Sequence, residues 1–195
     1  MNNNTMFLLL IIIIALALVL VVLQLVPIIS KIATRLNKRS SYNKLGESSK
    51  IRLIHQINDA VIDLSKARIG AIITIVKKDP LDRFRTDGIK IDANLSSSLI
   101  LAIFNKNSPL HDGAIIIEDN RIKYAATYYR ITSKSVSNHF GARHRAALGI
   151  SEHTDAITIV ISETNGSVTF AIDGKFVIVK ASDFQEKLTA YLNKM

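Results

Sequence analysis

Two short motifs, about thirty residues apart, contain the residue types that could do chemistry. The first places Asp112 and Gly113 at the end of a loop, directly before an apolar run that begins at Ala114. Glycine after a carboxylate lets a ligand approach the backbone closely, although Asp-Gly is also common in ordinary turns. The neighbouring His111 favours chemistry, because imidazole and carboxylate together can hold a divalent cation.

The second motif is a pair of arginines, Arg143 and Arg145, on either side of His144. Small residues frame it, with Gly141 and Ala142 before it and an Ala-Ala-Leu-Gly run after it. Small neighbours let the start of a helix pack close to a ligand, and guanidinium groups recognise phosphates, often with two hydrogen bonds. The alternative is a solvated basic stretch, which this framing disfavours. Together the two motifs predict metal-assisted phosphoryl or nucleotidyl transfer, without naming the nucleotide.

Composition excludes several classes of protein. The 195 residues include no cysteine, which rules out disulfides and thiolate metal sites. The net charge of +9 would suit a nucleic-acid binder, but residues 31–50 hold six basic side chains against one acidic, whereas 51–195 hold 19 against 15. Over half of the excess therefore lies beside an apolar segment, where anionic lipid headgroups would attract it. We expect no nucleic-acid partner, since no surface of interleaved aromatic and basic residues is evident.

The apolar segment has the length of a membrane span. Residues 6–26 contain no charge and one polar side chain, Gln24, and as a helix they would extend about 31 Å, close to the roughly 30 Å of a hydrocarbon core. The basic start and cleavage site of a signal peptide are not seen. We expect a short tail at 1–5 and one transmembrane helix at 6–29. Basic residues follow the segment, which predicts a single-pass protein of the cell membrane with a cytoplasmic C-terminal part.

The remaining residues must supply the elements that position the motifs. Residues 30–49 predict a basic linker, and 50–195 predict one domain. Apolar spacing of three and four residues predicts helices near 51–64, 95–105, 140–149 and 183–193. Short β-branched runs between turn residues predict strands at 71–76, 114–118, 122–127, 156–162, 168–172 and 176–179. We therefore expect an α/β fold with a mixed β-sheet flanked by helices and preceded by one transmembrane helix.

Residues 67–71, 95–114 and 141–156 resemble a diadenylate cyclase domain, of the membrane-bound branch with a single span found in mycoplasma-type enzymes. The specific signal is the ordered pair Asp112-Gly113-Ala114 and Arg143-His144-Arg145. The resemblance implies that 50–195 is a catalytic domain that condenses two ATP into cyclic di-3′,5′-adenylate and two pyrophosphates. It implies a divalent metal, Mn²⁺ or Mg²⁺, and a homodimer, because each domain holds one ATP and two must meet face to face.

The resemblance also implies roles for residues of the first motif. Asp112 would deprotonate the 3′-hydroxyl beside a metal ion, with His111 as a further metal ligand. Gly113 would let the ribose or phosphate approach the backbone, and Ala114 would border the ATP. The adenine pair of the family falls on Tyr128 and Tyr129, and a half-exposed strand tyrosine is the alternative for the second of them.

The phosphate side follows from the second motif. Arg143 and Arg145 would hold phosphates as pyrophosphate leaves, and His144 would orient that group. Gly141 and Ala142 would contact ATP, although Ala142 stands where relatives often carry threonine. The pair Ser162 and Glu163 resembles a polar pair near the triphosphate, and a hairpin-flanking pair is the alternative.

A membrane-tethered adenine-nucleotide sensor without turnover is the other hypothesis. The presence of Asp112, Arg143 and Arg145 argues against it, because a sensor has little need of a carboxylate on the metal side.

Overall fold

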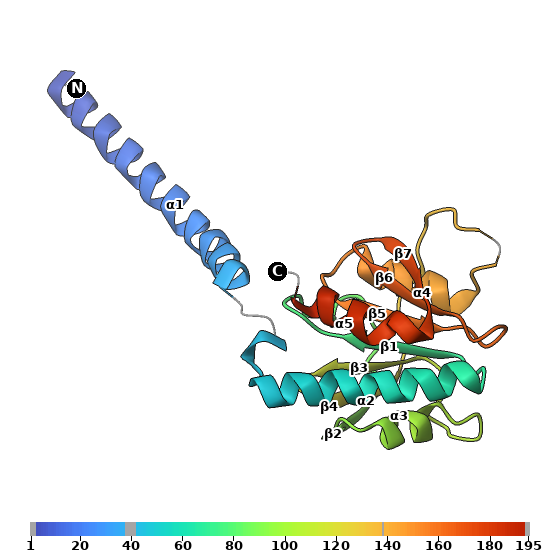
Figure 1. Ribbon diagram of the computed structural model, residues 1–195. Helices are drawn as coiled ribbons and strands as arrows, with labels where there is room; N and C mark the ends of the chain where they lie inside the picture. Colours follow the sequence, from blue (N-terminus) through green and yellow to red (C-terminus); the bar gives the residue numbers. More distant parts are fainter. Residues whose placement is uncertain (1–2, 38–41, 138, 194–195) are drawn as a thin grey trace. The chain divides into compact units, whose positions relative to one another are not determined.

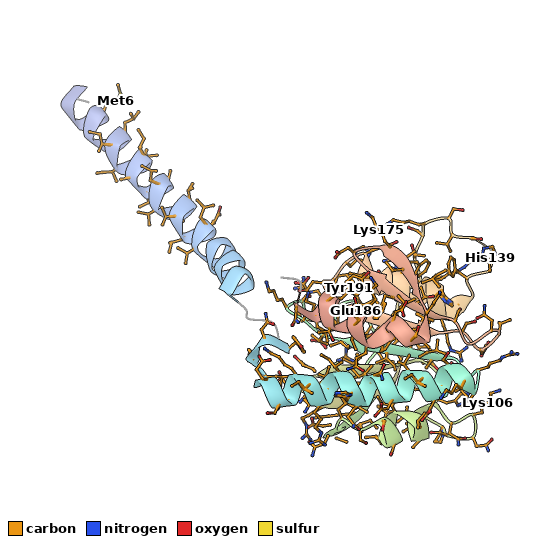
Figure 2. All side chains as sticks on the ribbon, viewed as in Figure 1. Met6, Lys106, His139, Lys175, Glu186 and Tyr191 are labelled. Carbon is orange, nitrogen blue, oxygen red and sulfur yellow. The ribbon has the colours of Figure 1, made fainter. Side chains whose placement is uncertain are left out.

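The computed structural model describes residues 3–37, 42–137 and 139–193, which fall into two compact units, Met1–Lys38 and Arg39–Met195. The described part of the first unit is one helix, α1 (Asn3–Asn37). Its described side chains, those of Met6 and residues 10–26, are all exposed, and Figure 2 shows them projecting around the helix. In the described part of the chain, no helix is long and apolar enough to cross a membrane. Of the prediction for 6–29, the helix is confirmed and the span is not shown.

The second unit is a mixed α/β domain (Figure 1). Its helices are η1 (Tyr42–Lys44), α2 (Glu47–Lys66), α3 (Ser97–Phe104), α4 (Ala142–Ser151), η2 (Ala181–Asp183) and α5 (Phe184–Asn193). Its strands are β1 (Ala71–Ile75), β2 (Ile89–Asn94), β3 (Ala114–Glu118), β4 (Arg121–Thr127), β5 (Ile157–Ile161), β6 (Val168–Ile172) and β7 (Lys175–Val179).

The strands form one seven-stranded sheet in the order β2-β4-β3-β1-β5-β6-β7. Only β1 and β3 pair in parallel among these neighbours, with Ile73 opposite Ile115. Hairpins join β3 to β4 and β5 to β6, as the Asn120 and Asn165-Gly166 turns predict. Because β1 and β3 run in parallel, the residues that precede both strands lie at the same edge of the sheet.

Helices cover both faces of the sheet. In β1, Ile73 and Ile75 join the larger core with α2, α3 and α5. Ile72, and Val76 directly after the strand, belong to the core on the other side, to which α4 contributes Ile150. This alternation follows from the two-residue period of a strand, and the five residues of β1 are all buried because both faces are covered. The predicted mixed sheet flanked by helices is confirmed, and so are all the predicted strands and helices of this unit, with ends that differ by a few residues.

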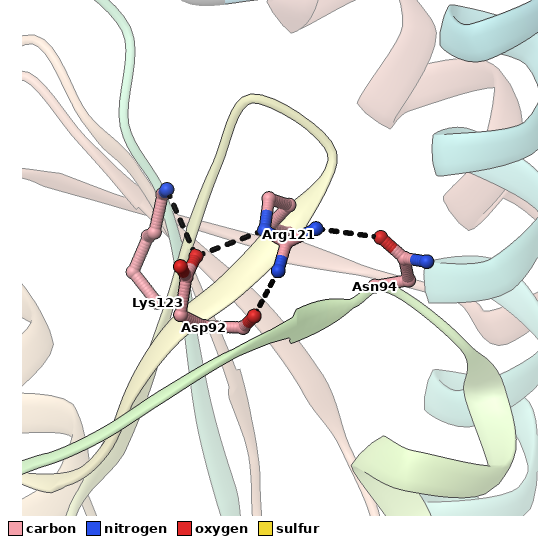
Figure 3. A network of polar contacts seen from close by, with 4 residues as sticks. All are labelled: Asp92, Asn94, Arg121 and Lys123. Atoms are coloured by element: carbon pink, nitrogen blue, oxygen red, sulfur yellow. Dashed lines mark hydrogen bonds and ion pairs between the residues drawn. The ribbon is translucent and has the colours of Figure 1, made fainter.

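Strand β2 is the element that sequence analysis missed. It is an edge strand whose pairing with β4 is interrupted between Lys90 and Ala93, where Asp92 has a positive φ of 47°. Asp92 accepts hydrogen bonds from Arg121 Nε at 2.8 Å and Lys123 Nζ at 3.0 Å (Figure 3). These hydrogen bonds, of which the one from Arg121 has the larger effect, lower the pKa of Asp92 to about 2. A bulge held by charged side chains interrupts the apolar alternation that would have revealed the strand.

The start of the domain also differs from the expected linker. Helix α2 begins at Glu47 rather than at residue 51, and Tyr42 is 3% exposed within the larger core. The Lys50 ammonium lies 5.5 Å from the centre of the Tyr42 ring. Part of the polar stretch at 30–49 therefore packs onto the domain, because its one aromatic side chain has apolar surface to cover.

Candidate functional site

The first motif lies where β3 begins, beside the end of β4. Gly113 has a φ of +102°, a conformation that favours glycine, and a Cβ there would lie 2.9 Å from both the carbonyl carbon of Ala126 and the carbonyl oxygen of Thr127. Glycine is thus required by its own backbone angle and by the neighbouring strand. Asp112, directly before it, is exposed at this edge of the sheet.

Tyr128 reaches across to the same edge. Its hydroxyl donates a hydrogen bond to Asp112 Oδ2 at 3.0 Å, and this bond raises the pKa of Tyr128. The backbone of Tyr128 is fixed by Thr86, whose amide donates to the Tyr128 carbonyl at 2.9 Å and whose hydroxyl accepts from the Tyr128 amide at 3.0 Å. The Tyr128 side chain is 50% exposed, and through this hydrogen bond a residue predicted to contact the base also touches the predicted catalytic carboxylate.

Tyr129 is placed differently. It is 7% exposed and packs with Ile72 and Ile116 in the core on the α4 side of the sheet, and burial raises its pKa. Only a small part of this ring faces the pocket described below. The two adjacent tyrosines thus differ in burial, although both line that pocket.

The second motif forms the first turn of α4, and its three side chains meet three environments. Arg143 Nη1 donates to Glu163 Oε2 at 2.7 Å, which joins α4 to the end of β5. His144 is 6% exposed, with Phe140 at 5.0 Å between ring centres, and burial lowers its pKa. Arg145 Nε donates to the Phe140 carbonyl at 3.4 Å. Residues two apart on a helix lie about 200° apart around its axis, so the two arginines point away from each other.

Two pockets adjoin at Ala142 and Arg143. The larger, of about 180 Å³, has mainly apolar walls and Asp112 at its rim; its lining is Ile72, Asp112, Gly113, Thr127, Tyr128, Tyr129, Ile131, Ala142, Arg143 and Ala146. The smaller, of about 120 Å³, is more polar; its lining is His139, Gly141, Ala142, Arg143, His144, Ile161, Ser162, Glu163 and Thr164. An apolar pocket beside a polar one, with an arginine between them, suits a base and its phosphates.

Three predicted site residues line neither of these pockets: His111, Ala114 and Arg145. Ala114 is 1% exposed in the core, and Arg145 contacts the loop before α4. His111 Nδ1 lies 2.7 Å from the Ser108 carbonyl oxygen, which can only accept, so Nδ1 carries the proton. This leaves Nε2 as the nitrogen able to bind a metal. Among the described residues, no three His, Asp or Glu side chains form a group that could hold a metal ion.

Several residues at the site were not predicted from the sequence, and three of them matter for the geometry. Thr127 and Ile131 line the larger pocket on either side of the two tyrosines. Gly70 lies beneath the Arg143–Glu163 pair. Gly70 belongs to the segment 67–71 that carries part of the resemblance, but only the folded arrangement of β1, α4 and β5 reveals what it contacts.

Comparison with known proteins decides the family. A model described as "DAC: DisA bacterial checkpoint controller nucleotide-binding" matches residues 58–176. This chain belongs to the DAC family. Its DAC domain contains both predicted motifs, and the resemblance inferred from them is confirmed.

Similar proteins support the same relation. The "Diadenylate cyclase" of Mycoplasma genitalium is 34% identical over 169 residues, which cover 85% of this chain and 78% of that protein. The "Cyclic di-AMP synthase CdaS" of Bacillus subtilis is 44% identical over 128 residues, which cover 62% of each chain. A crystal structure of a DacA double mutant from Staphylococcus aureus is 37% identical, with a TM-score of 0.71 over 75% of this chain and 99% of that one. The chain thus spans less than two thirds of the length of CdaS.

Proposed function

We propose that the chain is a diadenylate cyclase, which condenses two ATP molecules into cyclic di-3′,5′-adenylate and releases two pyrophosphates. The observation that carries the proposal is the pair of pockets that adjoin at Arg143, with Asp112 at the rim of one and Glu163 at the rim of the other. Membership of the DAC family and the names of its relatives support the same reaction.

The two pockets suggest how one ATP would lie. Adenine and ribose would occupy the larger pocket, against the exposed Tyr128 ring and Ile131. The phosphates would extend past Arg143 into the smaller pocket, where the start of α4 and Ser162 offer hydrogen-bond donors. Arg143 would then exchange the Glu163 carboxylate for phosphate oxygens, since both are anionic acceptors that fit a guanidinium group.

A divalent cation fits the edge of the sheet that holds Asp112. His111 presents Nε2, and the exposed Asp112 carboxylate has one oxygen, Oδ2, bonded to Tyr128. Mg²⁺ and Mn²⁺ commonly take one or two protein ligands and complete their shell with substrate phosphates and water, which suits a site with few protein ligands. When bound, such an ion would neutralise phosphate charge and acidify a coordinated hydroxyl.

The chain's own residues would perform the remaining steps. Asp112 would take the proton of the ATP 3′-hydroxyl, so that this oxygen can attack the α-phosphorus of a second ATP and expel pyrophosphate. Arg143 would stabilise the charge that develops on the departing phosphates. One domain would hold one ATP in its two adjoining pockets, so the second ATP would come from another copy, and we propose a homodimer with two domains face to face.

We also propose that α1 tethers the domain to the cell membrane with the domain in the cytoplasm. The described side chains of α1 are exposed and almost entirely apolar, and basic residues follow the apolar stretch. Confining copies to one surface would raise the rate at which two domains meet.

The direct test uses the full-length chain in detergent with ATP and Mn²⁺ or Mg²⁺. We expect cyclic di-AMP and pyrophosphate in a ratio of one to two, at a rate per molecule that rises with protein concentration because two domains form the site. Asp112→Asn should lower the rate by about 100-fold or more, the usual contribution of a general base. ATP binding without any product would instead support the nucleotide sensor.

A further inference from the structure

Gly70 is a buried residue directly before β1, and the Arg143–Glu163 ion pair lies over it. A Cβ atom at position 70 would lie 2.9 Å from Arg143 Cζ, 2.9 Å from Arg143 Nη1 and 3.1 Å from Glu163 Oε2. A Cβ atom is not found this close to a non-bonded heavy atom unless one of the two moves. Any residue larger than glycine would therefore move this ion pair.

The backbone at Gly70 does not itself require glycine. Gly113, Gly166 and Gly174 have positive φ angles, whereas Gly70 does not, so an alanine could adopt its backbone without strain. The atoms that a Cβ would contact at Gly70 also differ from those at other packed glycines such as Gly149. A Cβ at Gly149 would lie 2.1 Å from the carbonyl oxygen of Arg130, which is backbone, but the three atoms nearest to a Cβ at Gly70 belong to the flexible ends of two side chains. The glycine at 70 thus preserves space for Arg143.

Three elements converge at this space. Ala71 pairs with Ile161 in the antiparallel β1–β5 ladder, so Gly70 lies at the same end as Ser162 and Glu163. Arg143 reaches this end from the first turn of α4, and its side chain is 28% exposed, whereas that of Glu163 is 61% exposed. The guanidinium of Arg143 therefore occupies the space that a side chain at position 70 would fill. It is held there by an ion pair with Glu163, whose carboxylate is largely in solvent.

We propose that Gly70 is a positioning residue for nucleotide binding: its missing side chain creates the seat in which Glu163 holds the Arg143 guanidinium, between the two pockets, until phosphate oxygens replace the carboxylate. This inference rests on the proposed function, because it takes the phosphates of ATP as the anions that Arg143 receives. Gly70 itself touches no substrate, and it acts through Arg143 alone.

The test is Gly70→Ala in the full-length chain, with ATP binding measured by calorimetry in EDTA, where no divalent cation supports turnover. We expect the Kd for ATP to rise about tenfold, the size of one weakened charge-assisted hydrogen bond. Turnover with metal should show a raised KM with kcat changed less, because the displaced arginine weakens phosphate binding before it affects the reacting atoms. The Tm should stay within about 2 °C of the parent, since the residues that must move are side-chain ends.

Two further variants make the result decisive. In an Arg143→Ala background, Gly70→Ala should leave the Kd for ATP unchanged, because the residue it displaces is gone. Gly149→Ala is the matched control for a glycine packed against backbone, and we expect its Tm to fall by about 5 °C or more. An unchanged Kd for Gly70→Ala, an equal loss without Arg143, or a fall in Tm like that of Gly149→Ala would each overturn the inference. Product formation is measured separately, so failure of the cyclase proposal would appear as absent cyclic di-AMP whatever Gly70→Ala does to binding.

Discussion

The two arginines of the second motif share one helical turn and lie in opposite surroundings. Arg143 faces the two pockets and pairs with Glu163, whereas Arg145 faces the loop that crosses α4. A helix turns about 100° per residue, so side chains two apart cannot act on one ligand from the same side. We therefore propose that this motif, which the sequence suggests is one phosphate site, divides within this chain into an arginine that binds phosphate, Arg143, and one that supports the fold, Arg145.

On the Arg145 side, α4 is crossed by residues 130–134, a segment that we call the strap. The Thr132 amide donates to the Arg145 carbonyl at 3.1 Å, and the Thr132 hydroxyl donates to Glu152 Oε1 at 2.6 Å. Lys134 adds an ion pair to Glu152 at 3.3 Å. Gly149 lets the strap cross the helix closely. The strap places Ile131 at the rim of the larger pocket, so the Arg145 side supports the nucleotide site indirectly.

The largest expected effect separates the two sides by ligand binding. Arg143→Ala should raise the Kd for ATP by about 10- to 100-fold, because it removes charge-assisted hydrogen bonds to phosphate. The Tm should hardly change, since Arg143 pairs with a carboxylate that is mostly exposed and such pairs contribute little to stability. Arg143→Lys should bind ATP with intermediate affinity, because an ammonium lacks the planar fork. An unchanged Kd for Arg143→Ala would remove the phosphate role.

The second-largest effect is expected when the strap loses the hydrogen bond from Thr132 to the Glu152 carboxylate. Thr132 is 8% exposed, and Thr132→Val should lower the free energy of unfolding by about 2 kcal/mol, as measured by urea denaturation. The same bond is the main cause that lowers the pKa of Glu152. The stability that a lowered carboxyl pKa contributes is present above the pKa of the unfolded state and is lost as the pH falls through the pKa of the folded state. The Thr132→Val variant lacks this contribution, so it should lose less stability on acidification. Equal acid sensitivity in parent and variant would contradict this assignment.

A smaller loss is expected from Arg145 itself. Arg145→Ala removes a long hydrogen bond to the Phe140 carbonyl and the packing of the side-chain stem, and should cost about 1 kcal/mol of unfolding free energy. Its Kd for ATP should change less than threefold, about the factor that half a kcal/mol gives. If calorimetry showed the Arg145 variant binding ATP as poorly as the Arg143 variant, the division of the motif would be wrong.

The smallest effect concerns His144, which lies between the two sides. Burial lowers its pKa, so the unfolded chain binds a proton at a higher pH than the folded chain does. Stability should therefore fall as pH drops through the ordinary histidine range near 6.5, and His144→Gln should remove this part of the fall. Urea unfolding of both proteins at about pH 7.5 and about pH 5.5 brackets that range. The same pH dependence in both would show that another group is responsible.

The fold was largely predictable from the sequence because it depends on local periodicity. Residues 114–118 and 168–172 are apolar, β-branched runs between turn residues, and they are strands β3 and β6. Strand β2 was not predicted because its bulge at Asp92 breaks the apolar alternation. The ion pair between Asp92 and Arg121 joins two strands, so it cannot be inferred before the pairing of those strands is known.

The site was predictable only in part for a related reason. Asp112 and Arg143 stand out by residue type and lie at one pocket. The separation of Arg143 from Arg145 could have been inferred, because the predicted helix over 140–149 already places them on different faces. The role of Gly70 could not, since it depends on β1, α4 and β5 meeting at one point, which no local pattern specifies.

The most direct measurement is the initial rate of cyclic di-AMP formation by the parent, Arg143→Ala and Arg145→Ala proteins, side by side with ATP and Mn²⁺. All three should be assayed at a temperature where circular dichroism shows them folded, so that differences in stability do not affect the rates. We expect product from the parent, a rate lower by about 100-fold or more for Arg143→Ala, and a rate within about tenfold of the parent for Arg145→Ala. Equal losses in the two variants, or no product from the parent, would contradict the proposal that one arginine of this motif binds the substrate and the other supports the fold.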